Sequence, residues 1–228
     1  MVLLLFASCS SQINGVLREG GSADLDIKAS VEPRMSTLIR SLKAVLGNTG
    51  NDPVLDGPSI SRSLATSPGV RAAALVNTGP SALEGTVSIS RVEDFLASGQ
   101  GTPFIAYSEN NSGGKSSGHI LISLDRKNVP LLLDLLSSEA IDYLSALMAP
   151  AVLDEDISRS DYLMLVGALY SQAIVTEIES ARVLAEIEFP GPITTIRGGT
   201  AEGSHATFDI PLLDLLVLEK PLSWEVSW

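Results

Sequence analysis

The sequence predicts a domain of the α+β class, in which a mostly antiparallel sheet is built from N- and C-terminal strands and covered on one face by central helices. Segments that alternate apolar and polar residues, as half-buried strands do, occur before residue 128 and after residue 181. The two longest stretches with helical spacing, 129–149 and 160–181, lie between them. A length of 228 residues is sufficient for one sizeable domain.

The first half of the chain predicts several short elements. Residues 24–31 alternate as a strand, and Pro33 then opens a helix whose apolar residues continue at helical spacing to Gly47. The other elements expected here are a short helix at 59–65, strands at 70–76 and 85–90, a helical turn at 92–98, and a hairpin of strands 103–108 and 119–125 around a polar loop.

The second half predicts helices followed by strands. Ser158 and Asp161 form a capping box before helix 160–181. Strands are expected at 182–189 and 222–228, with a hairpin between 193–199 and 204–210. Residues 211–218 fit either a short helix or a buried strand.

The charge distribution excludes several classes of partner. The net charge is −12, and residues 128–219 account for it with three basic and fifteen acidic side chains. Nucleic acids and anionic lipid head groups attract basic surfaces, so neither is an expected electrostatic partner. A single cysteine and two histidines far apart in sequence, His119 and His205, predict no disulfide, no metal site and no cofactor.

No stretch of the sequence predicts catalysis. The loop SGGKSS lacks a phosphate-binding motif, because Glu109 stands where the first glycine would be. There is no G-x-S-x-G elbow around a serine. We therefore expect a protein that is not an enzyme. The alternative is a periplasmic enzyme, which a pocket combining a histidine, a carboxylate and a serine would favour.

The stretch LFASC resembles the lipobox of bacterial lipoproteins. An apolar run over residues 2–6 leads through small residues into Cys9, and a polar run with Ser10 and Ser11 follows. The resemblance implies lipid on Cys9, a remnant of a signal peptide at 1–8, a tether at 9–22 and a folded α+β domain at 23–228. The alternative is that residues 1–8 form a strand and that Cys9 is buried.

Helix 129–149 is predicted to be unusually apolar. Its polar residues form a narrow stripe, so apolar side chains occupy more of its circumference than one buried face requires. We expect hydrophobic surface or ligand contacts at Leu132, Leu136, Tyr143 and Leu147. The alternative is that the helix is buried on two sides, between the sheet and helix 160–181.

Together the lipobox, the α+β body and the apolar helices resemble treponemal outer-membrane-associated lipoproteins. The resemblance implies a non-enzymatic protein of the cell envelope, attached by its N-terminal lipid to a membrane on the periplasmic or outer-membrane side. Its expected partner is a hydrophobic ligand, a membrane surface or a protein, and not a nucleic acid.

Overall fold

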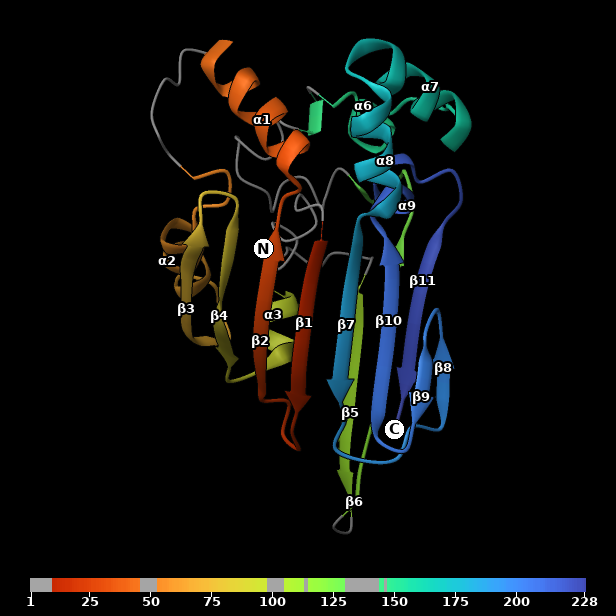
Figure 1. Ribbon diagram of the computed structural model, residues 1–228. Coiled ribbons are helices and arrows are strands. Elements are labelled where there is room, and N and C mark those ends of the chain that lie inside the picture. The colour runs from red at the N-terminus through yellow and green to blue at the C-terminus, as the bar shows by residue number, and fades with distance from the viewer. Residues whose placement is uncertain (1–9, 46–52, 98–104, 113–114, 130–143, 146) are drawn as a thin grey trace.

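The computed structural model describes residues 10–45, 53–97, 105–112, 115–129, 144–145 and 147–228 (Figure 1). In this part of the chain a seven-stranded sheet has the order β3-β4-β2-β1-β7-β10-β9. Its strands are β1 (Ser10–Leu17), β2 (Ala23–Ser30), β3 (Val70–Gly79), β4 (Ala82–Ile89), β7 (Arg182–Glu188), β9 (Thr200–Glu202) and β10 (His205–Pro211).

Strand β1 lies at the centre of this sheet. It pairs antiparallel with β2 and parallel with β7, where Ser10 is opposite Arg182. The tether predicted for residues 9–22 is therefore wrong over residues 10–17, and the folded body begins before Ala23. The serines and the glycine of β1 are typical of a linker, but Ile13 and Leu17 are buried in the core, and the small residues fit between the neighbouring strands.

A second sheet of four strands packs against the first. Its order is β5-β6-β11-β8, with β5 (Ile105–Ser112), β6 (Lys115–Leu124), β8 (Thr195–Arg197) and β11 (Leu222–Ser227). One core cluster contains Ile13 and Val183 of the large sheet together with Val226 of the small one and Trp228, which directly follows β11. The two sheets therefore share an apolar interior, like the layers of a sandwich.

The helices lie against the edges of the two sheets and at one of their ends. Helix α2 packs against β3, and α3 packs against β5. Helices α1 and α6 to α9 gather at one end of the sheets, drawn at the top of Figure 1. The helices are α1 (Pro33–Val45), α2 (Gly57–Ala65), α3 (Val92–Ala97), α6 (Pro150–Leu153), α7 (Arg159–Leu169), α8 (Gln172–Ser180) and α9 (Leu212–Val217).

The predicted fold class is confirmed, with eight antiparallel pairs of strands and one parallel pair in the described part of the chain. The single helix predicted at 160–181 is instead two, α7 and α8. Extended Ser171 interrupts it, and the Ser171 hydroxyl accepts a hydrogen bond from the Ile174 amide at 3.4 Å. The predicted hairpin of 193–199 with 204–210 is also wrong, because β8 pairs with β11 in the other sheet.

None of the helices that the structure describes combines the length and the apolar character that a bilayer-spanning helix needs.

Candidate functional site

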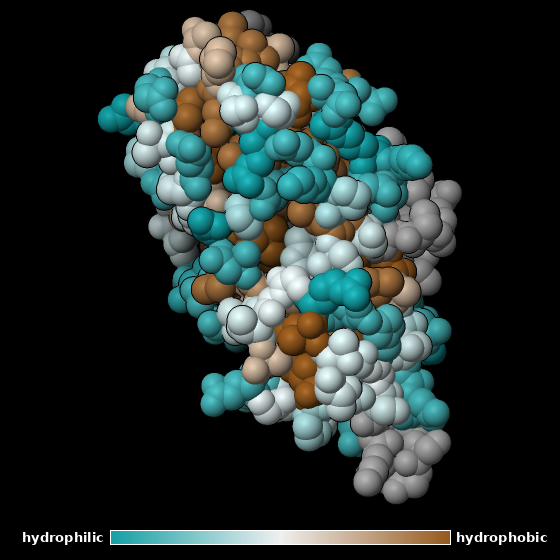
Figure 2. Space-filling view, turned by 90° about the vertical axis from the view of Figure 1, so that its right-hand side faces the viewer, coloured by the Kyte–Doolittle hydropathy of each residue, from teal (hydrophilic) through white to brown (hydrophobic). Residues whose placement is uncertain are grey.

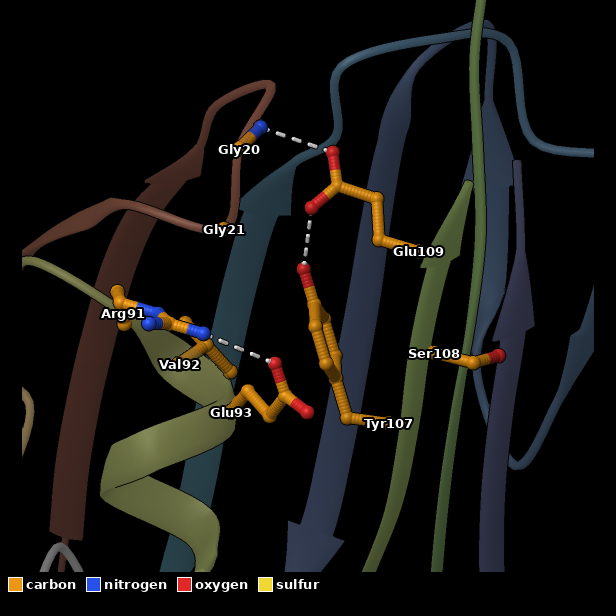
Figure 3. Close-up of a pocket in the computed structure, with 8 residues that line it drawn as sticks. All are labelled: Gly20, Gly21, Arg91, Val92, Glu93, Tyr107, Ser108 and Glu109. Atoms are coloured by element: carbon orange, nitrogen blue, oxygen red, sulfur yellow. Dashed lines mark hydrogen bonds and ion pairs between the residues drawn. The ribbon is translucent and has the colours of Figure 1, made fainter. Parts of the chain in front are cut away.

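A polar cavity of about 340 Å³ opens where the β1–β2 turn, the start of α3 and strand β5 meet (Figure 3). Its lining residues are Gly20, Gly21, Arg91, Val92, Glu93, Tyr107, Ser108 and Glu109. The volume falls within the range of small-molecule sites, whose lower limit is roughly 300 Å³. The β1–β2 turn follows the last residue of β1, so the cavity lies at the opposite end of that strand from Ser10.

Two consecutive glycines shape one wall of the cavity. Gly20 and Gly21 both have positive φ, at 83° and 74°, a region that favours glycine. The turn is closed by the Arg18 amide, which donates to the Ser22 carbonyl at 2.8 Å. The Gly21 carbonyl in turn accepts a hydrogen bond from the Val92 amide at 2.8 Å, which attaches the start of α3 to this wall.

Glu109 is held in place from two sides. One carboxylate oxygen accepts a hydrogen bond from the Gly20 amide at 2.9 Å, and the other accepts one from the Tyr107 hydroxyl, also at 2.9 Å. Partial burial, together with the Glu109 carboxylate, raises the pKa of the Tyr107 hydroxyl well above its usual value. Tyr107 therefore remains a proton donor to Glu109 at any physiological pH.

The opposite wall is charged and accessible. Arg91 approaches Glu93 and Asp94 at 3.4 Å each, and the Arg91 and Glu93 side chains are largely exposed. Figure 3 shows the Glu93 carboxylate opposite the Tyr107 ring, with Ser108 pointing away from the cavity. Ion pairs this exposed add little stability, so these groups remain available to a ligand.

Tyr107 packs against an aromatic cluster. The Trp228 ring lies 6.4 Å from the Tyr107 ring and 5.0 Å from the Phe189 ring, centroid to centroid. Trp228 and Gly118 exchange two backbone hydrogen bonds of 3.0 Å, and a side chain on Gly118 would overlap the indole. Tyr107 is thus supported by a packed layer, which fixes its position before any ligand enters.

This arrangement suits a ligand rich in hydroxyl or amino groups. Carboxylates accept hydrogen bonds from such groups, and an aromatic ring packs against the C–H face of a sugar-like molecule. One arginine and two glutamates give the lining a net negative charge, which disfavours anionic ligands. The described lining contains one serine, two glutamates and one arginine.

The residues singled out from the sequence do not form this cavity. Cys9, Leu132, Leu136 and Tyr143 lie outside the described residues, as does most of the predicted helix 129–149. Leu147 is described; it is 8% exposed within the main core cluster, and its carbonyl accepts a hydrogen bond from the buried Tyr162 hydroxyl at 3.1 Å. The expected hydrophobic contacts of the other three residues remain a prediction.

The histidines also lie away from the cavity lining. His119 is 3.2 Å from a Glu225 oxygen on the small sheet, and His205 is exposed on β10. Among the described residues, no three histidine, cysteine, aspartate or glutamate side chains converge in a way that could hold a metal ion.

The sequence did contain a weak indication of the site. Tyr107 and Glu109 are two residues apart on β5 and so share one face, and the pair Gly20 and Gly21 indicates a tight turn. What the sequence could not indicate is that Gly20 and Glu109, 89 positions apart, are joined by a hydrogen bond.

Comparisons with known proteins reveal a distant structural similarity. No family model matches the chain, and no curated protein matches it. Among solved structures, it is similar to the folded domain of the Mycobacterium tuberculosis protein LppM, determined by NMR. The TM-score is 0.39 and the sequence identity 10%, over 96% of this chain and 87% of the other. A similarity this distant does not assign a function.

Proposed function

We propose that this protein is a lipid-anchored, non-enzymatic domain of the bacterial cell envelope that binds a small polar ligand. Cys9 carries the lipid, and the cavity of Tyr107, Glu109, Glu93 and Arg91 holds the ligand. The observation that carries the binding role is the fixed carboxylate of Glu109, which has two hydrogen-bond donors in place without any ligand. A group positioned in advance lowers the ordering cost of binding.

The ligand class follows from the lining. We expect a molecule of about monosaccharide size, neutral or positively charged, with several hydroxyl groups; an amino sugar combines these features. The ammonium group would lie between Glu93 and Glu109, and the hydroxyls would bond to Arg91 and to the Glu93 carboxylate. This polar ligand is proposed in addition to the hydrophobic ligand, membrane surface or protein partner that the sequence indicated.

Anchoring and binding occupy opposite ends of the same strand. Cys9 directly precedes Ser10, the first residue of β1, whereas the cavity follows Leu17. At about 3.3 Å per residue, the strand separates the two by more than about 20 Å. A lipid on Cys9 would therefore leave the cavity facing away from the membrane surface, open to dissolved molecules.

A matched series of sugars tests the ligand class. Ligand-observed NMR on the full chain would compare glucosamine, glucose and glucuronate, which differ mainly in charge. We expect binding in that order, with glucuronate weakest. Glu93→Gln and Tyr107→Phe should each weaken glucosamine binding, while Glu84→Gln, an exposed glutamate on β4 outside the cavity lining, should leave it unchanged. Binding that is strongest for glucuronate, or equal in all variants, would refute the proposal.

Mass spectrometry tests the anchor independently. The protein would be purified from bacterial membranes and digested, and the peptide that begins at Cys9 would be examined for added acyl chains. We expect the mass of an acylated cysteine, with loss of acylation in Cys9→Ser. Recovery of an unmodified peptide that runs through Cys9 from the residues before it would refute lipidation and leave the ligand test unaffected.

A further inference from the structure

Helix α7 carries an apolar surface that nothing in the described part of the chain covers. Met164 is 72% exposed and Leu169 is 54% exposed, although large apolar side chains are usually buried. Ala168, one helical turn beyond Met164, is exposed as well. On its inner side the same helix buries Tyr162 and Val166 in the core, so α7 is apolar around most of its circumference.

The chain from Tyr162 to Thr176, which carries this surface, is uncharged, and the nearest acidic side chain on α7 is the exposed Asp161, one turn before Met164. Residues 162–176 contain no aspartate, glutamate, lysine or arginine. A helix exposed to water normally presents charged residues on its outer face, and a helix that is apolar on all sides is typical of a buried or lipid-contacting position. At the start of α7, Arg159 is paired with Asp214 at 2.8 Å, so the nearest cation is already neutralised.

The apolar surface lies at the end of the molecule where β1 begins. Helix α7 packs on α8, and α8 ends at Ser180, two residues before Arg182, the strand partner of Ser10. Figure 1 places α7 and α8 at the end of the sheets from which β1 starts, and Figure 2 shows apolar side chains exposed at that end. Among the described residues, the exposed Leu153 of α6 belongs to the same helical end.

The connection between an anchor at Cys9 and the large sheet is short. Successive Cα atoms are about 3.8 Å apart, so Cys9 lies within one residue of a strand fixed at the centre of the sheet. With no linker after it, lipid inserted through Cys9 would hold the helical end against the head groups.

We propose that the outer face of α7, formed by Met164, Ala168 and Leu169, inserts into the interfacial layer of the bilayer to which Cys9 is anchored. The inference rests on the proposed lipidation of Cys9, because the anchor determines which end of the domain meets the membrane. Contact through uncharged side chains does not require anionic lipids, which suits a chain whose net charge is −12. Interfacial helices bury their apolar face about 5–10 Å deep, a depth that methionine and leucine side chains reach.

A single introduced thiol tests this contact. Acylation occupies the sulfur of Cys9, the only cysteine of the chain, so Met164→Cys creates one free thiol for an environment-sensitive nitrobenzoxadiazole label. The lipidated full chain would be reconstituted in phosphatidylcholine vesicles, with and without nitroxide-bearing lipids. We expect a blue-shifted emission and quenching by the nitroxide lipids.

Glu202→Cys supplies the matched control. Glu202 is exposed on β9 and is opposite His205 of β10. His205 is opposite Glu188 of β7, and Glu188 is opposite Val16 of β1, so Glu202 lies level with Val16 across the sheet. Six residues of strand, about 20 Å, separate it from the level of Ser10. Its label should show the emission of a water-exposed probe and no quenching. Adding Leu169→Asp to Met164→Cys should abolish the blue shift while far-UV circular dichroism stays unchanged, because a carboxylate resists transfer out of water.

The outcomes separate the two proposals. If mass spectrometry confirms acylated Cys9 but the labels at 164 and 202 behave alike, the membrane contact of α7 is refuted and the anchor stands. If Cys9 carries no lipid, both the anchor and the contact that depends on it are refuted. A blue shift at 164 without quenching by the nitroxide lipids would also refute the contact, because it would place that label in a protein environment.

Discussion

Replacement of Trp228 by alanine should be among the most destabilising single changes in this domain. The side chain is 6% exposed and packs on Phe189 and Tyr107. A tryptophan buries up to about 250 Å², and at about 25 cal/mol per Å² this corresponds to roughly 6 kcal/mol. A compact unfolded chain lowers that value by about 10–40%, which leaves about 4 kcal/mol. Measured costs for aromatic-to-alanine changes in cores are about 3–5 kcal/mol.

Guanidinium unfolding followed by far-UV circular dichroism would measure this loss. A thermal scan of the same variant should show a fall in the melting temperature of about 8–16 °C, at about 2–4 °C per kcal/mol for chains of this size. Trp224→Ala is the matched control, because Trp224 lies on β11, the strand that ends just before Trp228, but is only partly buried, beside a small satellite cluster. Trp228→Phe keeps a ring in the layer and should cost about 1–2 kcal/mol.

The result that would refute this reasoning is a small loss at Trp228. If Trp228→Ala lowers the free energy of unfolding by less than about 1 kcal/mol, or no more than Trp224→Ala, the indole does not fill a packed layer between the sheets. The support that this layer gives to Tyr107 would then also be absent, and glucosamine binding would be insensitive to Trp228→Ala.

Three further changes test other parts of the fold. Gly85→Ala should cost about 3 kcal/mol or more, because Gly85 has φ 152° and a methyl group there would overlap the backbone of β3, whereas Gly79→Ala, with open space around it, should be nearly neutral in thermal unfolding. Ser158→Ala should cost about 1 kcal/mol in denaturant unfolding, because the Ser158 hydroxyl accepts a hydrogen bond from the Asp161 amide at 3.1 Å at the start of α7; an unchanged midpoint would contradict this. Burial raises the pKa of the Tyr107 and Tyr162 hydroxyls, so their contribution to stability is complete below about pH 10 and should decline as the pH rises further, because the unfolded state releases these protons first. In chemical unfolding at increasing alkaline pH, the free energy of unfolding should decline less steeply with pH in Tyr162→Phe than in the wild type. Equal slopes would contradict the contribution of Tyr162.

Local signals in the sequence located most of the elements correctly. Strand β2 and helix α1 follow directly from alternation and from Pro33, and the cap of α7 from Ser158 and Asp161. In each case the signal lies within the segment that it specifies, so neighbouring residues suffice to predict it.

Strand β1 was missed because its burial depends on distant partners. Gly15 is a good residue there only because the side chains of Leu25 and Ile187 close over it from the two neighbouring strands. Read alone, a serine- and glycine-containing stretch has the composition of a linker. Parallel pairing with β7 joins residues some 170 positions apart, and no local pattern reports it.

The cavity shows the same limit of prediction from local sequence patterns. Tyr107 and Glu109 share one face of β5 by their spacing, but their function depends on the turn at Gly20 and on Glu93 at the start of α3, which only the tertiary fold brings to them. The sequence therefore indicated which side chains point the same way, and not what they meet.

The central place of β1 has a consequence for release from a membrane. Many surface proteins are shed when a protease cuts a stalk between anchor and body, and the body leaves intact. Here Ser10 already belongs to the fourth strand of seven, with a neighbour on each side. A cut within β1 would divide the sheet and expose the edges of β2 and β7. Once attached through Cys9, such a molecule would remain at its membrane for its whole folded lifetime, and shedding would destroy it.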